Sequence, residues 1–367
     1  MPLVELTING RPVRVEEGST VLDAATAAGI KIPTLCHHPA LPDIGACRIC
    51  VVEVGIPATR MNADGTAETT YTTSLQPACT YPAANDIRVE THTAEAIAVR
   101  RFVVEMLLSD HPLDCMTCDA AGNCALQDVA YELEVKEPLY AGERHHYAAD
   151  DPNPFFERDY NKCIVCQACV RACSSINGVE AISMLNRGFQ TKPGTADDGY
   201  LEDSPCEFCG MCVEVCPTAA LYPKAAKGQA RTWEIEPVTT TCGYCGVGCQ
   251  LDLRIKDGRI IQVASNWDAP ANHGWTCVKG RFGFDFVHHP DRLKSPLIKK
   301  DGRFVEASWD EALGLVADKL AEVKNRHGGD AIGVLSSAKC TNEENYLLQK
   351  LTRAVLETNN VDHCARL

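Results

Sequence analysis

The sequence has no segment long and apolar enough to cross a membrane. One of its longer apolar stretches, residues 101–108, contains Glu105 and falls far short of the roughly 18 residues that a spanning helix requires. The N-terminal residues lack a basic region followed by an apolar run, which argues against a secretory signal. We therefore expect a cytoplasmic chain with no direct membrane insertion.

Positive charge is also scarce. The net charge is −14, and no run of five or more lysine or arginine residues occurs. Nucleic acids and anionic membrane surfaces both require a basic face, so we expect neither as a partner. A Ser-His-Asp arrangement, a phosphate-binding P-loop and a dinucleotide fingerprint are missing as well.

Cysteine, in contrast, is abundant, with 21 residues in a chain of 367. Thiols stay reduced in the cytoplasm, so clustered cysteines there indicate metal ligands rather than disulfides. Nineteen of the cysteines and one histidine fall into five sets with ligand-like spacing. These sets predict one two-iron and four four-iron clusters.

The first set belongs to a predicted domain at residues 1–91. Residues 3–16 predict a β-hairpin that turns at Asn9-Gly10, a short helix follows, and residues 57–74 are a polar excursion. Together these elements predict a β-grasp domain of the two-iron ferredoxin type. The predicted ligands of its 2Fe-2S cluster are Cys36, Cys47, Cys50 and Cys79. A zinc site is the alternative for this spacing.

The second set belongs to a predicted domain at residues 92–135. Residues 93–108 and 125–134 predict helices on either side of a cysteine loop at residues 115–124. One imidazole and three thiolates complete a four-ligand site, and imidazole changes the charge and potential of a cluster. The predicted ligands of this 4Fe-4S cluster are His111, Cys115, Cys118 and Cys124.

The third and fourth sets form an internal repeat in a predicted domain at residues 154–226, after a linker at residues 148–154. The spacing C-x2-C-x2-C-x3-C occurs twice, at an offset of 43 residues. It is typical of bacterial two-cluster ferredoxins, in which the fourth cysteine of each run binds the other cluster. The predicted 4Fe-4S ligands are Cys163, Cys166, Cys169 and Cys216 for one cluster, and Cys206, Cys209, Cys212 and Cys173 for its neighbour.

The fifth set lies in a predicted domain at residues 235–291. Three of its cysteines precede a hairpin that turns at Asp257-Gly258, and the fourth follows it, so folding of the hairpin closes the ring. The predicted 4Fe-4S ligands are Cys242, Cys245, Cys249 and Cys277. A zinc ribbon is the alternative, and Lys279 is positioned to lie beside the cluster.

The remaining residues, 292–367, predict two helices that begin at Ser308 and Thr341, with an apolar strand at residues 331–335 between them. Helix, strand and helix indicate the opening of an α/β domain, and a single strand leaves that domain incomplete. The expected fold class is therefore an α+β multidomain iron–sulfur protein.

These motifs resemble a known group of enzymes. Residues 1–225, with His-Pro-Leu-Asp-Cys-Met-Thr-Cys at 111–118, resemble the N-terminal module that the large subunit of NADH dehydrogenase shares with iron-only hydrogenases and NAD(P)-linked formate dehydrogenases. Residues 235–290 resemble the cluster domain of molybdopterin oxidoreductases, and residues 336–367 are similar to formate dehydrogenase alpha subunits.

The resemblance implies oxidation of formate to CO2 at molybdenum or tungsten held by bis-molybdopterin guanine dinucleotide, with Lys279 between that centre and the Cys242 cluster. The electrons would pass the ferredoxin pair to the His111 and Cys36 clusters. The implied partners are flavin diaphorase subunits that reduce NAD(P), or ferredoxin or a hydrogenase module. A selenocysteine or cysteine metal ligand is expected directly after Leu367, and our hypothesis is that an in-frame UGA codon ends the reading frame there. The alternatives are the large iron–sulfur subunit of an NADH–quinone oxidoreductase and a stand-alone electron carrier.

Overall fold

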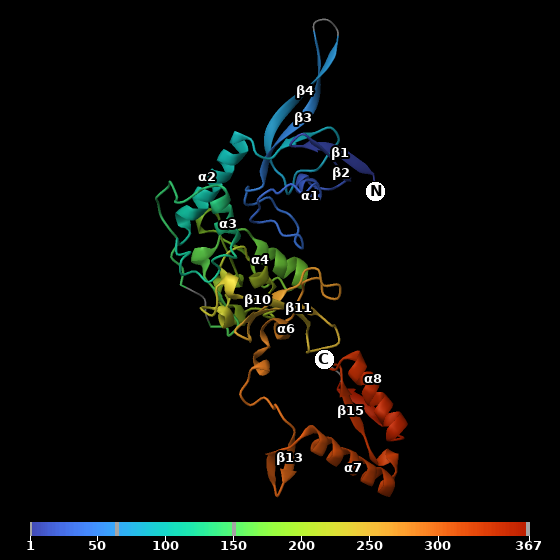
Figure 1. Cartoon of the computed structure of the whole chain (residues 1–367). Coiled ribbons are helices and arrows are strands. Elements are labelled where there is room, and N and C mark those ends of the chain that lie inside the picture. The colour runs from blue at the N-terminus through green and yellow to red at the C-terminus, as the bar shows by residue number, and fades with distance from the viewer. Residues whose placement is uncertain (1, 63–65, 149–151, 365–367) are drawn as a thin grey trace. The chain divides into compact units, whose positions relative to one another are not determined.

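The computed structural model describes residues 2–62, 66–148 and 152–364. Contacts divide the chain into two compact units, residues 1–235 and residues 236–367, which can be followed by colour in Figure 1. The predicted linker at residues 148–154 lies partly outside the described residues. Within the described residues, no helix combines the length and the apolar character that crossing a membrane demands.

The first unit contains helices and strands in mixed order. Its α-helices and strands are β1 (Leu3–Ile8), β2 (Arg11–Glu16), α1 (Val21–Ala27), β3 (Val51–Met61), β4 (Ala67–Pro77), β5 (Arg88–Glu90), α2 (Ala94–Asp110), α3 (Ala125–Glu132), β6 (Phe156–Arg158), α4 (Ala168–Arg171), β7 (Ser183–Leu185), β8 (Lys192–Gly194), α5 (Met211–Glu214) and β9 (Leu221–Pro223). Its short 3₁₀ and π segments are η1 (Tyr160–Lys162), η2 (Ala172–Asn177), η3 (Gly188–Gln190), η4 (Ala196–Asp198), η5 (Leu201–Asp203), η6 (Lys224–Ala226) and η7 (Thr232–Glu234).

A five-stranded sheet in the order β2-β1-β5-β3-β4 organises the N-terminal part. The predicted hairpin is confirmed, since β1 and β2 pair antiparallel around Asn9 and Gly10, which both have positive φ. The predicted helix is confirmed as α1, which begins after the capping residue Thr20. Alternating apolar side chains of β1 are buried with those of β3 and β5 in one core.

The alternation along β1 gives a matched pair of substitutions. Leu6 is 1% exposed in the core, whereas Leu3 on the same strand is 61% exposed. We expect Leu6→Ala to lower the stability of this sheet by about 2–5 kcal/mol, because it leaves a cavity. Leu3→Ala should change it by less than about 0.5 kcal/mol. Hydrogen exchange of the β1 amides measures both, and equal exchange rates in the two variants would contradict this placement of the core.

In the predicted polar excursion at residues 57–74, residues 57–61 and 67–74 form a regular antiparallel ladder, and residues 63–65 lie outside the described residues. β3 and β4 pair from Val51 with Pro77 to Met61 with Ala67, and both strands extend beyond their neighbours in the sheet (Figure 1). Threonine residues favour β-strands, and several of them lie along β4. The hairpin returns the chain to its starting point, so that the amide of Ala78 donates to the carbonyl of Cys50 (3.1 Å).

The predicted helices at residues 93–108 and 125–134 are confirmed as α2 and α3. Arg100 on α2 is buried, and its Nε and Nη2 atoms donate to the carbonyl of Val51 at 3.1 and 2.6 Å. This contact fixes α2 against β3. The helix ends at His111, the residue that caps its C-terminus.

The internal repeat is visible in the backbone. Helices α4 and α5 begin at positions 168 and 211, which differ by the repeat offset of 43 residues. β6 and β9 pair antiparallel, so the chain entering the repeat lies beside the chain leaving it. A second two-stranded sheet, β7-β8, lies between the two halves in the sequence.

The second unit has three small sheets. Its elements are β10 (Glu236–Thr241), β11 (Gln250–Lys256), β12 (Arg259–Ser265), α6 (Val278–Phe282), η8 (Asp285–Val287), β13 (Leu297–Lys300), β14 (Arg303–Glu306), α7 (Trp309–His327), η9 (Gly329–Ala331), β15 (Val334–Ser337), α8 (Asn342–Lys350), η10 (Leu351–Val355) and β16 (Val361–Cys364). The predicted hairpin is confirmed as β11 and β12. β10 adds a strand that the sequence did not predict.

The last domain begins as predicted, with Ser308 and Thr341 capping α7 and α8. The expectation of a single strand is wrong, because β15 pairs in parallel with β16. α8 lies between these two strands in the chain, and a crossover through a helix is what a parallel pair requires. The structure thus contains one complete strand–helix–strand unit.

Candidate metal centres

The first predicted ligand set converges in the N-terminal sheet domain. Cys36, Cys50 and Cys79 are each 2% exposed or less. Cys36 and Cys47 lie in the loop after α1, and the amide of Cys47 points at the sulfur of Cys36 (3.5 Å). Hydrogen bonds from the thiols of Cys47 and Cys79 lower the pKa of Cys36. The same contacts, together with burial, raise the pKa of Cys47 and Cys79, so the four sulfurs form one connected group.

The second set surrounds an open cavity of about 820 Å³. His111, Cys115 and Cys124 line it, whereas Cys118 lies outside its lining. The imidazole of His111 is buried, and in the described part of the chain its Nδ1 atom has no hydrogen-bond partner. Burial also lowers the pKa of His111. The ring is therefore neutral at physiological pH, which is the form that binds metal.

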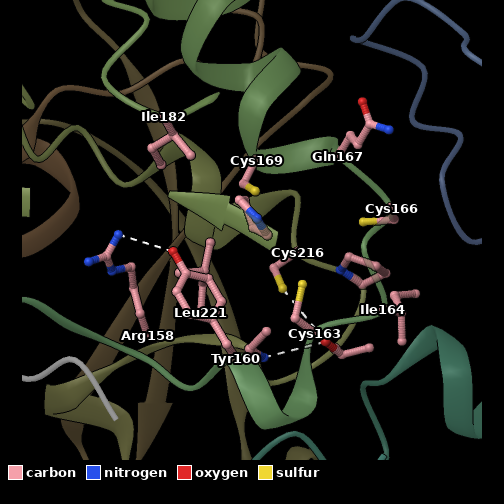
Figure 2. A pocket seen from close by; sticks show the side chains of 14 residues that line it. Arg158, Tyr160, Cys163, Ile164, Cys166, Gln167, Cys169, Ile182, Cys216 and Leu221 are labelled. Carbon is pink, nitrogen blue, oxygen red and sulfur yellow. Dashed lines mark hydrogen bonds between the residues drawn. The ribbon is translucent and has the colours of Figure 1, made fainter. Parts of the chain in front are cut away.

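The third set lines a single pocket, drawn in Figure 2. Its cysteines Cys163, Cys166 and Cys169 come from one half of the repeat, and Cys216 comes from the other. In Figure 2, Cys163 and Cys216 lie side by side, with Tyr160 and Leu221 beside them. The pocket therefore has the mixed composition that the sequence predicts.

The fourth set lines a second pocket with the reciprocal composition. Cys206, Cys209 and Cys212 come from the second half of the repeat, and Cys173 comes from η2 in the first half. The amide of Ala181 donates to the sulfur of Cys173 (3.2 Å). Each half of the repeat thus supplies three cysteines to one pocket and one to the other.

The loops of the two pockets share a backbone device. Val165 and its counterpart Phe208 both have positive φ, and the amide of each donates to the first sulfur of its own run at 3.4 Å. Gln167 and Gly210, which precede α4 and α5, also have positive φ. These positive-φ residues turn the backbone around each pocket, so that backbone amides point toward the cysteine sulfurs. Such hydrogen bonds favour the more negative, reduced state of a bound cluster.

Burial controls the protonation of these thiols. Desolvation raises the pKa of Cys163 and of Cys166 to about 12, so both are neutral thiols at pH 7 in the absence of a cation. Bound iron would favour the thiolate, because it brings positive charge into the pocket and displaces the proton.

The fifth set lies in the second unit. Cys242 follows β10, Cys249 precedes β11, and Cys277 caps α6; these three and Cys245 line one pocket together with Lys279. The amide of Cys242 donates to the carbonyl of Cys249 (2.7 Å). A Cβ at Gly280 would lie 3.6 Å from the sulfur of Cys242, so the backbone of α6 passes close to the pocket.

The donor chemistry fits the predicted clusters. Four of the five sets consist of thiols alone, which suits iron and sulfide. The second set offers three thiols and the buried ring nitrogen of His111, which has no partner in the described part of the chain. Each set lines one space or forms one connected group, with Cys118 the exception, but among the described residues no three ligands are close enough to hold a single metal ion. The assignment of iron to these sites remains a prediction.

Comparison with known families covers most of the chain. Family profiles match a 2Fe-2S iron-sulfur cluster binding domain (residues 2–94), the NADH-ubiquinone oxidoreductase-G iron-sulfur binding region (residues 100–138), the ferredoxin-like domain of NADH-quinone oxidoreductase subunit 3 (residues 153–222), a molybdopterin oxidoreductase Fe4S4 domain (residues 235–289) and the molybdopterin oxidoreductase family (residues 292–367). The chain therefore combines regions that match 2Fe-2S, 4Fe-4S and molybdopterin oxidoreductase families.

Three curated relatives match almost the whole length of this chain. The alpha subunit of an NADPH-Fe(3+) oxidoreductase from Geobacter sulfurreducens is 37% identical over 100% of the chain, and a G-type NADH-quinone oxidoreductase subunit from Rhizobium meliloti is 37% identical over 99%. A Bacillus subtilis protein named "Putative formate dehydrogenase" is 33% identical over 99%. The chain spans 40% of the length of each of these relatives.

A solved structure matches part of this chain. A chain of an NAD+-reducing [NiFe]-hydrogenase is 31% identical, with a TM-score of 0.53. The match covers 62% of the present chain and 90% of the hydrogenase chain.

Sequence reasoning missed several side chains around the pockets of this chain. Tyr160 lines the Cys163 pocket, and Tyr244 lines the Cys242 pocket, where its hydroxyl donates to the carbonyl of Gly283. Arg171 contacts the loops of two ligand sets. The repeat gives no signal for Arg171, because the equivalent position in the second half is Glu214 and most other positions between the cysteines also differ.

Proposed function

We propose that this chain is the electron-relay portion of a cytoplasmic formate dehydrogenase catalytic subunit. The coarser role, an iron–sulfur electron relay of the molybdopterin oxidoreductase or NADH-quinone oxidoreductase G type, follows from the family. The observation that carries the relay role is the reciprocal sharing of Cys216 and Cys173 between two adjacent pockets. The formate specificity is supported by the similarity of residues 336–367 to formate dehydrogenases and by the Bacillus subtilis relative.

The residues of the chain have defined tasks in this proposal. The five sets would hold one 2Fe-2S and four 4Fe-4S clusters, and Lys279 would contact a pterin cofactor from the side of the Cys242 pocket. When bound, the clusters and a molybdenum or tungsten bis-molybdopterin guanine dinucleotide supply the redox chemistry for taking two electrons from formate as CO2 and a proton form. Buried thiols and amide donors then set the potentials.

We propose flavin diaphorase subunits that reduce NAD(P) as partners, with ferredoxin or a hydrogenase module as further partners. The names of the hydrogenase and of the Geobacter sulfurreducens relative include NAD+ and NADPH. A flavin diaphorase is the kind of subunit that exchanges electrons with these nucleotides, so the names support it as a partner.

The proposal predicts reduction by formate. The full-length gene product, purified anaerobically with its partner subunits, should lose its visible absorption between 400 and 500 nm, roughly, when formate is added, because reduced clusters absorb less. It should also form NADH or NADPH from the oxidised nucleotide. A complex that NADH reduces fully and formate does not reduce would contradict the formate assignment.

A second candidate is the large iron–sulfur subunit of an NADH–quinone oxidoreductase. It is favoured by the 37% identity to the G-type relative from Rhizobium meliloti, which exceeds the 33% identity to the formate dehydrogenase relative. The same experiment separates the two, since this candidate predicts NADH-dependent reduction of quinone and no response to formate. A stand-alone electron carrier would show neither activity and would still contain iron.

A further inference from the structure

Arg171 lies between two of the predicted cluster sites. It is the last residue of α4, two positions before Cys173, and it is only 7% exposed. The equivalent residue in the second half of the repeat is Glu214. The arginine is therefore not a shared feature of the two ferredoxin halves. The contacts around it must explain why an arginine lies at this position.

Its guanidinium group joins two ligand loops that are far apart in the sequence. Nη1 donates to the carbonyl of Pro42, and Nη2 donates to the carbonyl of Cys36. Nη2 also reaches the carbonyl of Cys166 (3.5 Å). Cys36 belongs to the two-iron set and Cys166 to the first ferredoxin set, so one side chain touches the backbone of a ligand from each.

Arg171 is a buried positive charge whose hydrogen-bond partners are all uncharged. Its hydrogen-bond partners are backbone carbonyls, and in the described part of the chain no carboxylate forms an ion pair with it. A buried cation without a negative partner is costly. Iron–sulfur clusters bound by four thiolates carry net negative charge, and two such sites beside the guanidinium would offset that cost.

We propose that Arg171 is a positioning residue shared by the Cys36 and Cys163 centres, and that its charge raises the reduction potential of both. Its bonds to the carbonyls of Pro42, Cys36 and Cys166 hold the Cys36 loop against the Cys166 loop, which fixes the spacing of the two centres. Its positive charge favours the reduced form of each centre, which has one more electron. The inference rests on the proposed ligand sets.

The contact also assigns the two centres as neighbours in the relay. An electron passing between them oxidises one centre and reduces the other by one electron, with no bond made or broken. The carbonyl of Cys36, the guanidinium and the carbonyl of Cys166 form a hydrogen-bonded link between the two ligand sets. The contact fixes the spacing of the two centres. The charge of Arg171 shifts both reduction potentials in the same direction and by a similar amount, so the difference between them, which drives the transfer, stays unchanged.

The test compares Arg171→Gln with Arg171→Lys in the anaerobically purified full-length complex. Reduction potentials are measured by titration followed by electron paramagnetic resonance, and iron and sulfide are quantified in parallel. The Cys163 signal is assigned by its loss in Cys216→Ala. The matched control is Arg101→Gln, because Nε of Arg101 also donates to a backbone carbonyl, that of Leu133 (2.9 Å), which belongs to neither ligand loop.

We expect Arg171→Gln to make reduction of both centres about tenfold less favourable, a fall of about 59 mV for a one-electron couple. Arg171→Lys keeps the charge and should shift both potentials less, and Arg101→Gln should leave both unchanged. Full iron content with unshifted potentials in Arg171→Gln would overturn the proposal. If that variant loses iron, Arg171→Lys decides, because it keeps the charge but its single nitrogen cannot occupy both of the positions from which Nη1 contacts Pro42 and Nη2 contacts Cys36. Wild-type potentials at both centres would then refute the shared role.

These outcomes are distinct from failure of the proposed function. Wild-type protein that contains zinc, or that gives no paramagnetic signal on reduction, would refute the ligand sets themselves. Iron-loaded variants whose potentials do not respond to Arg171 would refute only the role of this residue.

Discussion

Cys216→Ala will remove one four-iron centre and leave its neighbour intact, and Cys173→Ala will do the reverse. Cys216 lies in the second half of the repeat but lines the pocket of Cys163, and Cys173 lies in the first half but lines the pocket of Cys206. Because a four-iron cluster requires four protein ligands, each variant should lose up to about four iron atoms of the roughly 18 expected in the chain.

The spectra can show which centre is lost. Cys216→Ala and Cys163→Ala should leave the same paramagnetic signals after reduction, and Cys173→Ala should match Cys206→Ala instead. Cys340→Ala is the control, since Cys340 has no partner at ligand spacing and should retain all the iron. If Cys216→Ala matched Cys206→Ala, each half would bind its own cluster, and the crossed arrangement would be wrong.

The set of cysteines that lines each ferredoxin pocket was predictable, because it depends on local spacing. A run of C-x2-C-x2-C-x3-C can wrap one cluster with three residues only, so the fourth must point elsewhere. The structure groups the cysteines of the Cys163 and Cys206 sets as the spacing predicts. Cys118 is the exception to local reasoning, because it lies in the loop but outside the lining of the cavity.

Elements that depend on distant partners were harder to predict. β10 has the sequence Glu-Pro-Val-Thr-Thr-Thr, and all six residues are exposed, so no alternation of apolar side chains marks it as a strand. β16 forms only by pairing with β15, about two dozen residues earlier. The contacts of Arg171 with Cys36 and Pro42 cross more than a hundred residues, and no periodic pattern encodes them.

His111→Ala will remove the four-iron centre of the second set, whereas His111→Cys will keep it at a lower potential. The structure presents this side chain for binding, since α2 ends at His111 and its buried Nδ1 has no partner in the described part of the chain. Alanine leaves three thiols around an open cavity of about 820 Å³, which solvent can enter, so we expect a loss of up to about four iron atoms.

Cysteine at position 111 offers a thiolate in place of a neutral imidazole. The added negative charge disfavours the reduced state, so the potential should fall by on the order of 100 mV, in the direction seen when histidine and cysteine ligands are exchanged in two-iron centres. His146→Ala is the control, because His146 is exposed and belongs to no ligand set. The potential is read by titration of the resonance signal that His111→Ala lacks. Should His111→Ala keep every iron atom and every signal, an imidazole ligand would have no place in this centre, and its fourth ligand would have to be another residue or solvent.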